Sequence, residues 1–181
     1  MAKAAADGTE WLSDEEQRTW RGLVQLILEL QSEQEHALVD AHGITEGEYG
    51  VLVSLSEADD HRLRMCDLAQ RLRMSPSGLT RRIDGLAKRG LVVRAPAPDD
   101  RRVQLAVLTD QGMAKLEAAA PTHVAAVRES LIDHLSAEDL AVLGDVLDRA
   151  RQSRDGRAYL STRIQRGRTA TSKMKQTSWR R

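Results

Sequence analysis

The stretch of residues 75–108 restricts this chain to few folds, because a short, sharply bounded helix is followed at once by a β-hairpin. Ser75, followed by proline, is a preferred start for a helix, and Gly90 is a preferred end. The runs 91–93 and 103–108 are apolar and contain valines, and the segment between them is polar and holds two prolines. We therefore expect an amphipathic helix and then two strands joined by a long polar tip.

Most of the remaining chain is expected to be helical. Aromatic residues make up only 3% of the sequence and Phe is absent, so Leu, Val and Ala must fill the core, and Leu and Ala favour helices. Apolar residues recur at helical spacing from about Ser13 to Ala41, and Gly43 is a stop signal. A second helix is predicted to begin at Thr45 and to end at Asp59.

The segments on either side of the Ser75 helix complete the predicted fold. A short extended piece at 63–65 and a short helix at 67–72 precede it. Residues 110–134 have a helical pattern that Pro121 is expected to kink or break, and a last helix begins after Ser136. The fold class that we predict is mainly α with a small β-hairpin wing, that is, a winged helix-turn-helix domain plus a helical dimerisation bundle. The predicted parts are a DNA-binding domain at 44–109, a dimerisation region formed by 1–43 and 110–153, and a basic, disordered tail at 154–181.

Charge is unevenly distributed along the chain, although the formal net charge is zero. Residues 61–105 hold 11 Lys and Arg against 4 Asp and Glu, and residues 151–181 hold 10 against 1. The segments 1–60 and 106–150 are acidic. Clustered basic charge is typical of DNA-binding proteins, although solvated helix faces produce similar runs.

The helix that begins at Ser75 has one apolar face and one polar face. At about 100° per residue, Leu79, Ile83 and Leu86 lie together and anchor the helix. The opposite face carries side chains that can donate hydrogen bonds to phosphates and base edges, as Arg does to guanine. In a helix-turn-helix the second helix enters the major groove. The candidate DNA-binding residues of this helix are Ser75, Ser77, Thr80, Arg81, Arg82 and Lys88.

The hairpin tip supplies the other candidate DNA-binding residues, which are Asp99, Arg101 and Arg102. An Arg at such a tip can enter the minor groove, where negative potential is concentrated. Asp99 is expected to hold the Arg101 guanidinium in a bidentate ion pair. An Arg-rich hairpin alone is also compatible with an ordinary soluble turn, but its position directly after two short helices favours DNA binding.

Several short motifs occur in a fixed order within residues 13–153. They are DLAQRL at 67–72, SPSGLTR at 75–81, LAKRGLV at 86–92, DDRRV at 99–103 and LTDQG at 108–112. This series resembles the MarR family of transcriptional regulators. The resemblance implies a homodimer, joined by its first helix and last two helices, that binds a pseudopalindromic operator as a repressor and is released by a small ligand or an oxidant. It places the family's Asp-x-Arg wing motif on Asp99 and Arg101.

The sequence gives less information about the effector that would release such a repressor from DNA. The resemblance implies a small aromatic or phenolic effector, and Trp20 and Tyr49 are the candidate effector-binding residues, although both also lie at core spacing. Cys66 is a candidate redox sensor because it begins a short helix beside Arg64. A small buried residue is the simpler interpretation of this cysteine.

No pattern typical of an enzyme is found. The sequence has no Gly-rich phosphate loop, no nucleophile elbow and no His or Cys pair at metal-binding spacing. We therefore expect neither catalysis, nor a cofactor, nor a metal. The single cysteine and the lack of a long apolar run predict a cytoplasmic protein without a membrane partner. A helical scaffold that binds only protein is the rival function, which the basic helix and the wing disfavour.

Overall fold

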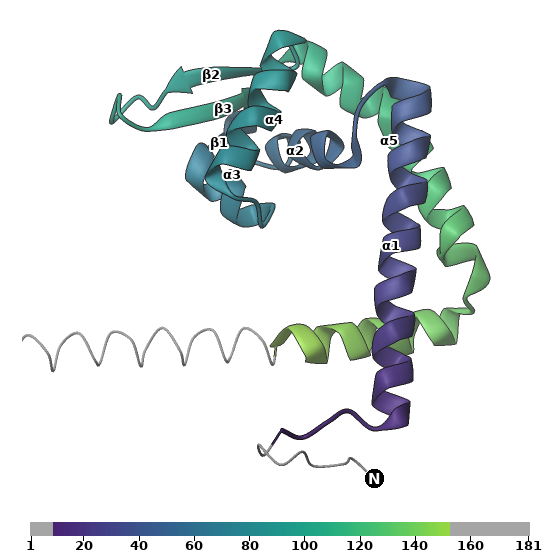
Figure 1. Ribbon diagram of the computed structural model, residues 1–181. Coiled ribbons are helices and arrows are strands. Elements are labelled where there is room, and N and C mark those ends of the chain that lie inside the picture. Colours follow the sequence, from purple (N-terminus) through teal and green to yellow (C-terminus); the bar gives the residue numbers. More distant parts are fainter. Residues whose placement is uncertain (1–8, 153–181) are drawn as a thin grey trace, which may run out of the picture. The chain divides into compact units, whose positions relative to one another are not determined.

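The computed structural model describes residues 9–152, so the predicted tail at 154–181 lies outside the described residues. The chain divides into two compact units after Leu131. Helices make up most of the described residues, and a small antiparallel sheet accompanies them (Figure 1). The predicted fold class, mainly α with a winged helix-turn-helix, is confirmed.

Helix α1 (Asp14–His42) begins and ends where the sequence predicts. The Ser13 hydroxyl accepts a hydrogen bond from the Glu16 amide, and the Glu16 carboxylate accepts one from the Ser13 amide, which forms a capping box. The Ser13 amide and the Ser13 hydroxyl both donate to the Glu16 carboxylate, and these two bonds lower the pKa of Glu16. Gly43 ends the helix at φ +62°, a conformation that glycine adopts without strain. α1 lies along α5 (Asp110–Ser130) within the first unit (Figure 1).

Helices α2 (Glu46–Ser56), α3 (Met65–Arg71) and α4 (Pro76–Lys88) surround the core of the first unit. The apolar side of α4 is inserted into this core, because Leu79, Ile83 and Leu86 are all buried, as their helical spacing predicts. Burial of one such side chain stabilises a fold by roughly 1.5–3 kcal/mol. The other fully buried leucines of the core include Leu38, Leu52, Leu55 and Leu68.

Three strands form one antiparallel sheet in the order β1-β3-β2, with β1 at Arg62–Arg64, β2 at Val92–Pro96 and β3 at Gln104–Leu108. β2 and β3 are the predicted hairpin. The sequence indicates an extended piece at β1 but not its partner, which is β3, with Leu63 opposite Ala106. β2 is an edge strand, which accommodates Pro96 because proline cannot donate to a further strand.

Helix α5 corrects one prediction. It begins where the Thr109 hydroxyl accepts a hydrogen bond from the Gly112 amide at 3.0 Å. The break expected at Pro121 does not occur, because the helix continues to Ser130. Proline removes one intrahelical hydrogen bond, and burial of Ala119 close by stabilises the continuous helix.

The second unit is described from Ile132 to residue 152. A 3-10 turn at Ile132–His134 leads into a helix at 137–152, and the Ser136 hydroxyl accepts a hydrogen bond from the Asp139 amide at 3.1 Å. The sequence predicts that the apolar side chains of this helix lie inward, but Val146 and Leu147 are exposed. Among residues 9–152, no helix is both long and apolar enough to cross a membrane.

Candidate nucleic-acid interface

Helices α3 and α4 are joined by a short turn at residues 72–75. The Met74 amide donates to the Ala69 carbonyl at 2.9 Å, and the Arg73 amide donates to the Gln70 carbonyl at 3.1 Å. Arg73 adopts φ +51°, which is uncommon for a residue with a side chain. These bonds close the turn tightly and give the two helices the order and connection of a helix-turn-helix.

One side of α4 is exposed and carries most of the polar residues that the sequence singles out. Arg81 lies on the second turn of the helix and Lys88 on its last turn. Neither side chain forms an ion pair with any other residue in the range 9–152, so both charges remain available for phosphates or bases. The predicted residues that are exposed on or next to α4 are Ser75, Ser77, Thr80, Arg81 and Lys88.

Arg82 differs from its neighbour Arg81, because its side chain turns toward the protein interior. Its Nη1 atom lies 3.0 Å from the Met74 sulfur. Its guanidinium covers Gly47 of α2, where any Cβ would overlap it. The side chain is half-buried. The prediction that Arg82 belongs to the DNA-facing group is therefore at odds with the packing of α4 on α2.

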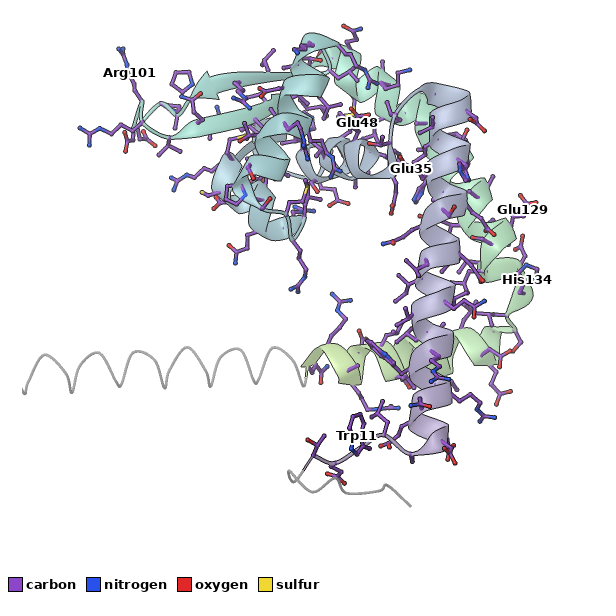
Figure 2. All side chains as sticks on the ribbon, in the orientation of Figure 1. Trp11, Glu35, Glu48, Arg101, Glu129 and His134 are labelled. Carbon is purple, nitrogen blue, oxygen red and sulfur yellow. The ribbon has the colours of Figure 1, made fainter. Side chains whose placement is uncertain are left out.

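The hairpin tip carries two exposed arginines, Arg101 and Arg102. Figure 2 shows Arg101 at the far end of the hairpin, directed away from the helices. The predicted ion pair between Asp99 and Arg101 is not found among the described residues. Asp100 orders the tip instead: its carboxylate accepts from the Arg102 amide, and its carbonyl accepts from the Val103 amide, each at 2.9 Å.

Ion pairs within the chain divide the basic residues of segment 61–105 into two groups. Arg89 donates to the Glu48 carboxylate at 3.1 Å, and Arg94 donates to Asp84 at 2.8 Å. Arg62 and Arg71 are also paired, with Asp60 and Glu57. Within segment 61–105, the exposed basic residues that form no ion pair with any described residue are Arg64, Arg73, Arg81, Lys88, Arg101 and Arg102.

Arg64 and Arg73 are not among the DNA-binding residues that the sequence predicts. Arg64 is the N-cap residue of α3, and Arg73 lies in the turn between α3 and α4. Both contribute to the positive charge of segment 61–105, which was the available signal. In helix-turn-helix proteins the first helix crosses the DNA backbone, and Arg64 and Arg73 lie at the two ends of that helix in this chain.

Comparison with known proteins agrees with this geometry. The model of the MarR family matches residues 44–103. AbsC, a MarR family transcriptional regulator from Streptomyces coelicolor, is 38% identical, with a TM-score of 0.76 over 82% of this chain and 99% of AbsC. The chain belongs to the MarR family.

Two further proteins connect the regulator with DNA. Sco3205, a MarR family regulator from Streptomyces coelicolor solved in complex with DNA, is 35% identical, with a TM-score of 0.76 over 80% of this chain and 91% of Sco3205. The transcriptional repressor YetL of Bacillus subtilis (strain 168) is 36% identical over 110 residues, which are 59% of this chain and 66% of YetL. The regulator is a DNA-binding transcription factor and not an enzyme.

A cavity of about 470 Å³ is lined by residues of α1, α2, α4 and the turn that joins α3 to α4. The Glu46 amide donates to the Glu35 carboxylate at 2.6 Å, which connects α2 with α1 at its wall. Figure 2 labels Glu35 on the side of α1 that faces α2. The cavity is lined by Gln31, Glu35, Thr45, Glu46, Gly47, Gly50, Leu72, Met74 and Arg82.

The two predicted effector-binding residues, Trp20 and Tyr49, do not line this cavity. Trp20 is 58% exposed and lies 22 residues before the end of α1, about 33 Å along a helix that rises 1.5 Å per residue. Tyr49 stacks on His123 of α5 with ring centroids 4.5 Å apart, and burial raises the pKa of its hydroxyl and lowers the pKa of His123. The structure therefore does not bring these two residues into one site.

Cys66 is exposed rather than buried, so the simpler sequence interpretation is wrong on this point. α3 turns Leu68 and Ala69 toward the core, and the cysteine lies outside that face. Its thiol donates to the Asp67 carboxylate at 3.3 Å.

Proposed function

We propose that the regulator is a homodimeric repressor that reads a pseudopalindromic operator with α4 and the hairpin tip. The observation that carries this proposal is the set of unpaired cations on the exposed side of α4 and at the tip of the hairpin. Because base contacts specify and phosphate contacts position, these side chains take different roles. Ser77 and Arg81 contact bases near the N-terminal end of α4, Lys88 contacts a phosphate, and Arg101 enters the minor groove.

The dimer is supported by apolar side chains that one chain leaves in solvent. Trp20, Leu23 and Ile27 are spaced along α1 at helical intervals, and each is at least 41% exposed. Val146 and Leu147 are exposed on the helix of the second unit. Contiguous exposed apolar side chains mark interaction surfaces. We assign these surfaces to the proposed dimerisation region, 1–43 and 110–153, and two copies then present two α4 helices to two half-sites.

Selection of bound fragments from genomic DNA tests this function. We expect the full-length chain to enrich sites with two related half-sites whose centres lie about one helical turn, or 10–10.5 base pairs, apart or at a multiple of it. Retention on heparin that falls with salt would support a basic DNA-binding surface. A chain that enriches no common sequence and is not retained at low salt would instead be a scaffold that binds only protein.

The two neighbouring arginines of α4 provide a matched pair of variants. We expect Arg81→Ala to weaken operator binding by on the order of 1 kcal/mol or more, because Arg81 is exposed and unpaired. Arg82→Ala should change the affinity by less than about threefold, since its guanidinium lies against Met74 and Gly47. Anisotropy titrations on one labelled operator duplex measure both. A larger loss from Arg82→Ala than from Arg81→Ala would reverse the assignment of the two faces.

We place the effector site in the cavity lined by Arg82, because Trp20 and Tyr49 do not line it. Arg82 offers a guanidinium without an ion pair among the described residues, and it belongs to the helix that reads DNA. A ligand that binds this guanidinium would act on α4 directly. We therefore propose that an aromatic or phenolic effector with an acidic group binds here and releases the operator. Arg82→Ala should then retain DNA binding in the presence of an inducer that releases the wild type.

The basic tail at 154–181 is proposed to add contacts that do not depend on sequence. It contains nine Lys and Arg residues and one Asp. Each phosphate contact contributes about 0.9 to the slope of log affinity against log salt, so two or three contacts change that slope by roughly 2–3. We expect deletion of 154–181 to weaken binding to operator and random duplexes equally and to flatten the salt dependence. Overlapping slopes for the deleted and full-length chains would show that the tail does not touch DNA.

A further inference from the structure

Arg94 of strand β2 bridges the hairpin and the middle of α4. Its Nη2 atom lies 2.8 Å from the Asp84 carboxylate and donates to the Thr80 carbonyl at 3.1 Å. Thr80 and Asp84 are one helical turn apart, so a single guanidinium holds two successive levels of the same helix. Within residues 9–152 this is the polar side-chain contact that ties β2 to α4.

Stability does not explain this contact well. The side chains of Arg94 and Asp84 are 35% and 50% exposed, and ion pairs that are exposed to this degree contribute little to folding. α4 is already fixed to the core through its buried apolar face. The base of the hairpin is fixed to the same core by Val92, Ala106 and Leu108, whereas its outer part extends away from the helices (Figure 1).

The ion pair with Arg94 also neutralises the negative charge of Asp84. Asp84 is the acidic residue on the side of α4 that carries Arg81 and Lys88, and a bare carboxylate there would repel phosphates. Both the ion pair with Asp84 and the hydrogen bond to the Thr80 carbonyl are made by the Nη2 atom of Arg94.

We propose that Arg94 is a positioning residue that locks the hairpin to α4, so that the two elements reach adjacent grooves together. This inference rests on the proposed function, in which Arg81 acts in the major groove and Arg101 in the minor groove. The DNA fixes the separation of the two grooves, so a hairpin that moves freely against α4 loses part of its binding energy when it is ordered. The lock therefore favours the operator, where both contacts are made, over random DNA.

The alternative is that Arg94 is itself a phosphate contact, and the salt dependence distinguishes the two roles. Loss of one phosphate contact lowers the salt slope by about 0.9 and weakens binding to every duplex. Loss of a positioning residue removes no contact to DNA. It lowers affinity for the operator much more than for random DNA, where only repulsion by the unpaired Asp84 carboxylate weakens binding, and it leaves the slope nearly unchanged.

The experiment uses the full-length chain with Arg94→Ala, Arg94→Lys and Asp84→Asn, on the selected operator and on a random duplex of equal length. We expect Arg94→Ala to lose about tenfold on the operator and less than about threefold on random DNA, with an unchanged salt slope and unfolding temperature. Arg94→Lys keeps the charge but lacks the rigid guanidinium whose Nη2 atom contacts both acceptors, so it should lose specificity partially. In an Asp84→Asn background, Arg94→Ala should cost less than it does alone.

Two results would overturn the proposal. One is a slope lowered by about 0.9 with parallel losses on both duplexes, which would make Arg94 a phosphate contact. The other is an affinity for the operator that is the same in Arg94→Ala and in Arg94→Lys as in the wild type. Neither result is confused with failure of the proposed function, because in that case the wild-type chain itself would not prefer the operator. If Arg94→Ala unfolds, Arg94→Lys and Asp84→Asn still decide the question.

Discussion

We expect Arg101→Ala to weaken operator binding by about 1–3 kcal/mol, a loss of roughly five- to 150-fold in affinity. Arg101 lies at the exposed end of the hairpin, as Figure 2 shows, and it forms no ion pair within the described residues. Its charge is therefore available to the minor groove, where the potential is most negative. Because Asp100 orders the tip through backbone hydrogen bonds, removal of the Arg101 side chain leaves the turn intact. Anisotropy titration on a labelled operator duplex measures the change.

Lys115→Ala is the control for this variant. Lys115 lies on α5 and donates to the His42 carbonyl at the end of α1, at 3.2 Å, so it serves the helical part of the molecule. Its removal takes away the same unit of charge without touching the hairpin, and we expect operator affinity to stay within about threefold of the wild type. Equal losses for the two variants would show that net charge, rather than the wing, explains the effect of Arg101.

Ile27→Glu should have the largest effect of all, because we expect it to separate the proposed dimer. Ile27 is 44% exposed in one chain and lies in the apolar stripe with Trp20 and Leu23. Burial of an unpaired carboxylate in an interface is strongly unfavourable. Linkage of two half-site contacts increases affinity by about 10²–10⁴ over one contact, so a monomer should bind the operator at least about 100-fold more weakly. Light scattering should give a mass near the 20.1 kDa of one chain.

Gln25→Glu is the matched control, since it places the same charge on another side of α1. Two residues correspond to about 200° around a helix, so Gln25 points away from the stripe that contains Ile27. Its side chain donates to Glu29 on the helix surface at 2.8 Å. This variant should remain dimeric and bind the operator normally. An Ile27→Glu protein that keeps twice the mass of one chain at micromolar concentration would place the interface elsewhere.

Local sequence was sufficient to predict the helices and the hairpin. Ser13 and Ser75 cap their helices within three residues, Gly43 ends α1, and the hairpin follows from two apolar runs around a polar segment. Such signals are reliable because capping and turn formation involve neighbours in the chain. The order of the local motifs is also sufficient to indicate the MarR family.

The direction of individual side chains depended on packing between distant segments. Around an isolated α4, Arg81 and Arg82 both border the polar face, and only the approach of Gly47 from α2 leaves room for Arg82 on the inner side. Likewise, the pairing of β1 with β3 and the bridge from Arg94 to Asp84 join residues that the sequence keeps apart. The spacing of apolar residues and the capping residues determine whether a segment forms a helix or a strand. The folded chain brings acidic partners to some of the basic residues and leaves the remaining ones unpaired and available for DNA. These contacts join distant segments, so no local sequence pattern predicts them.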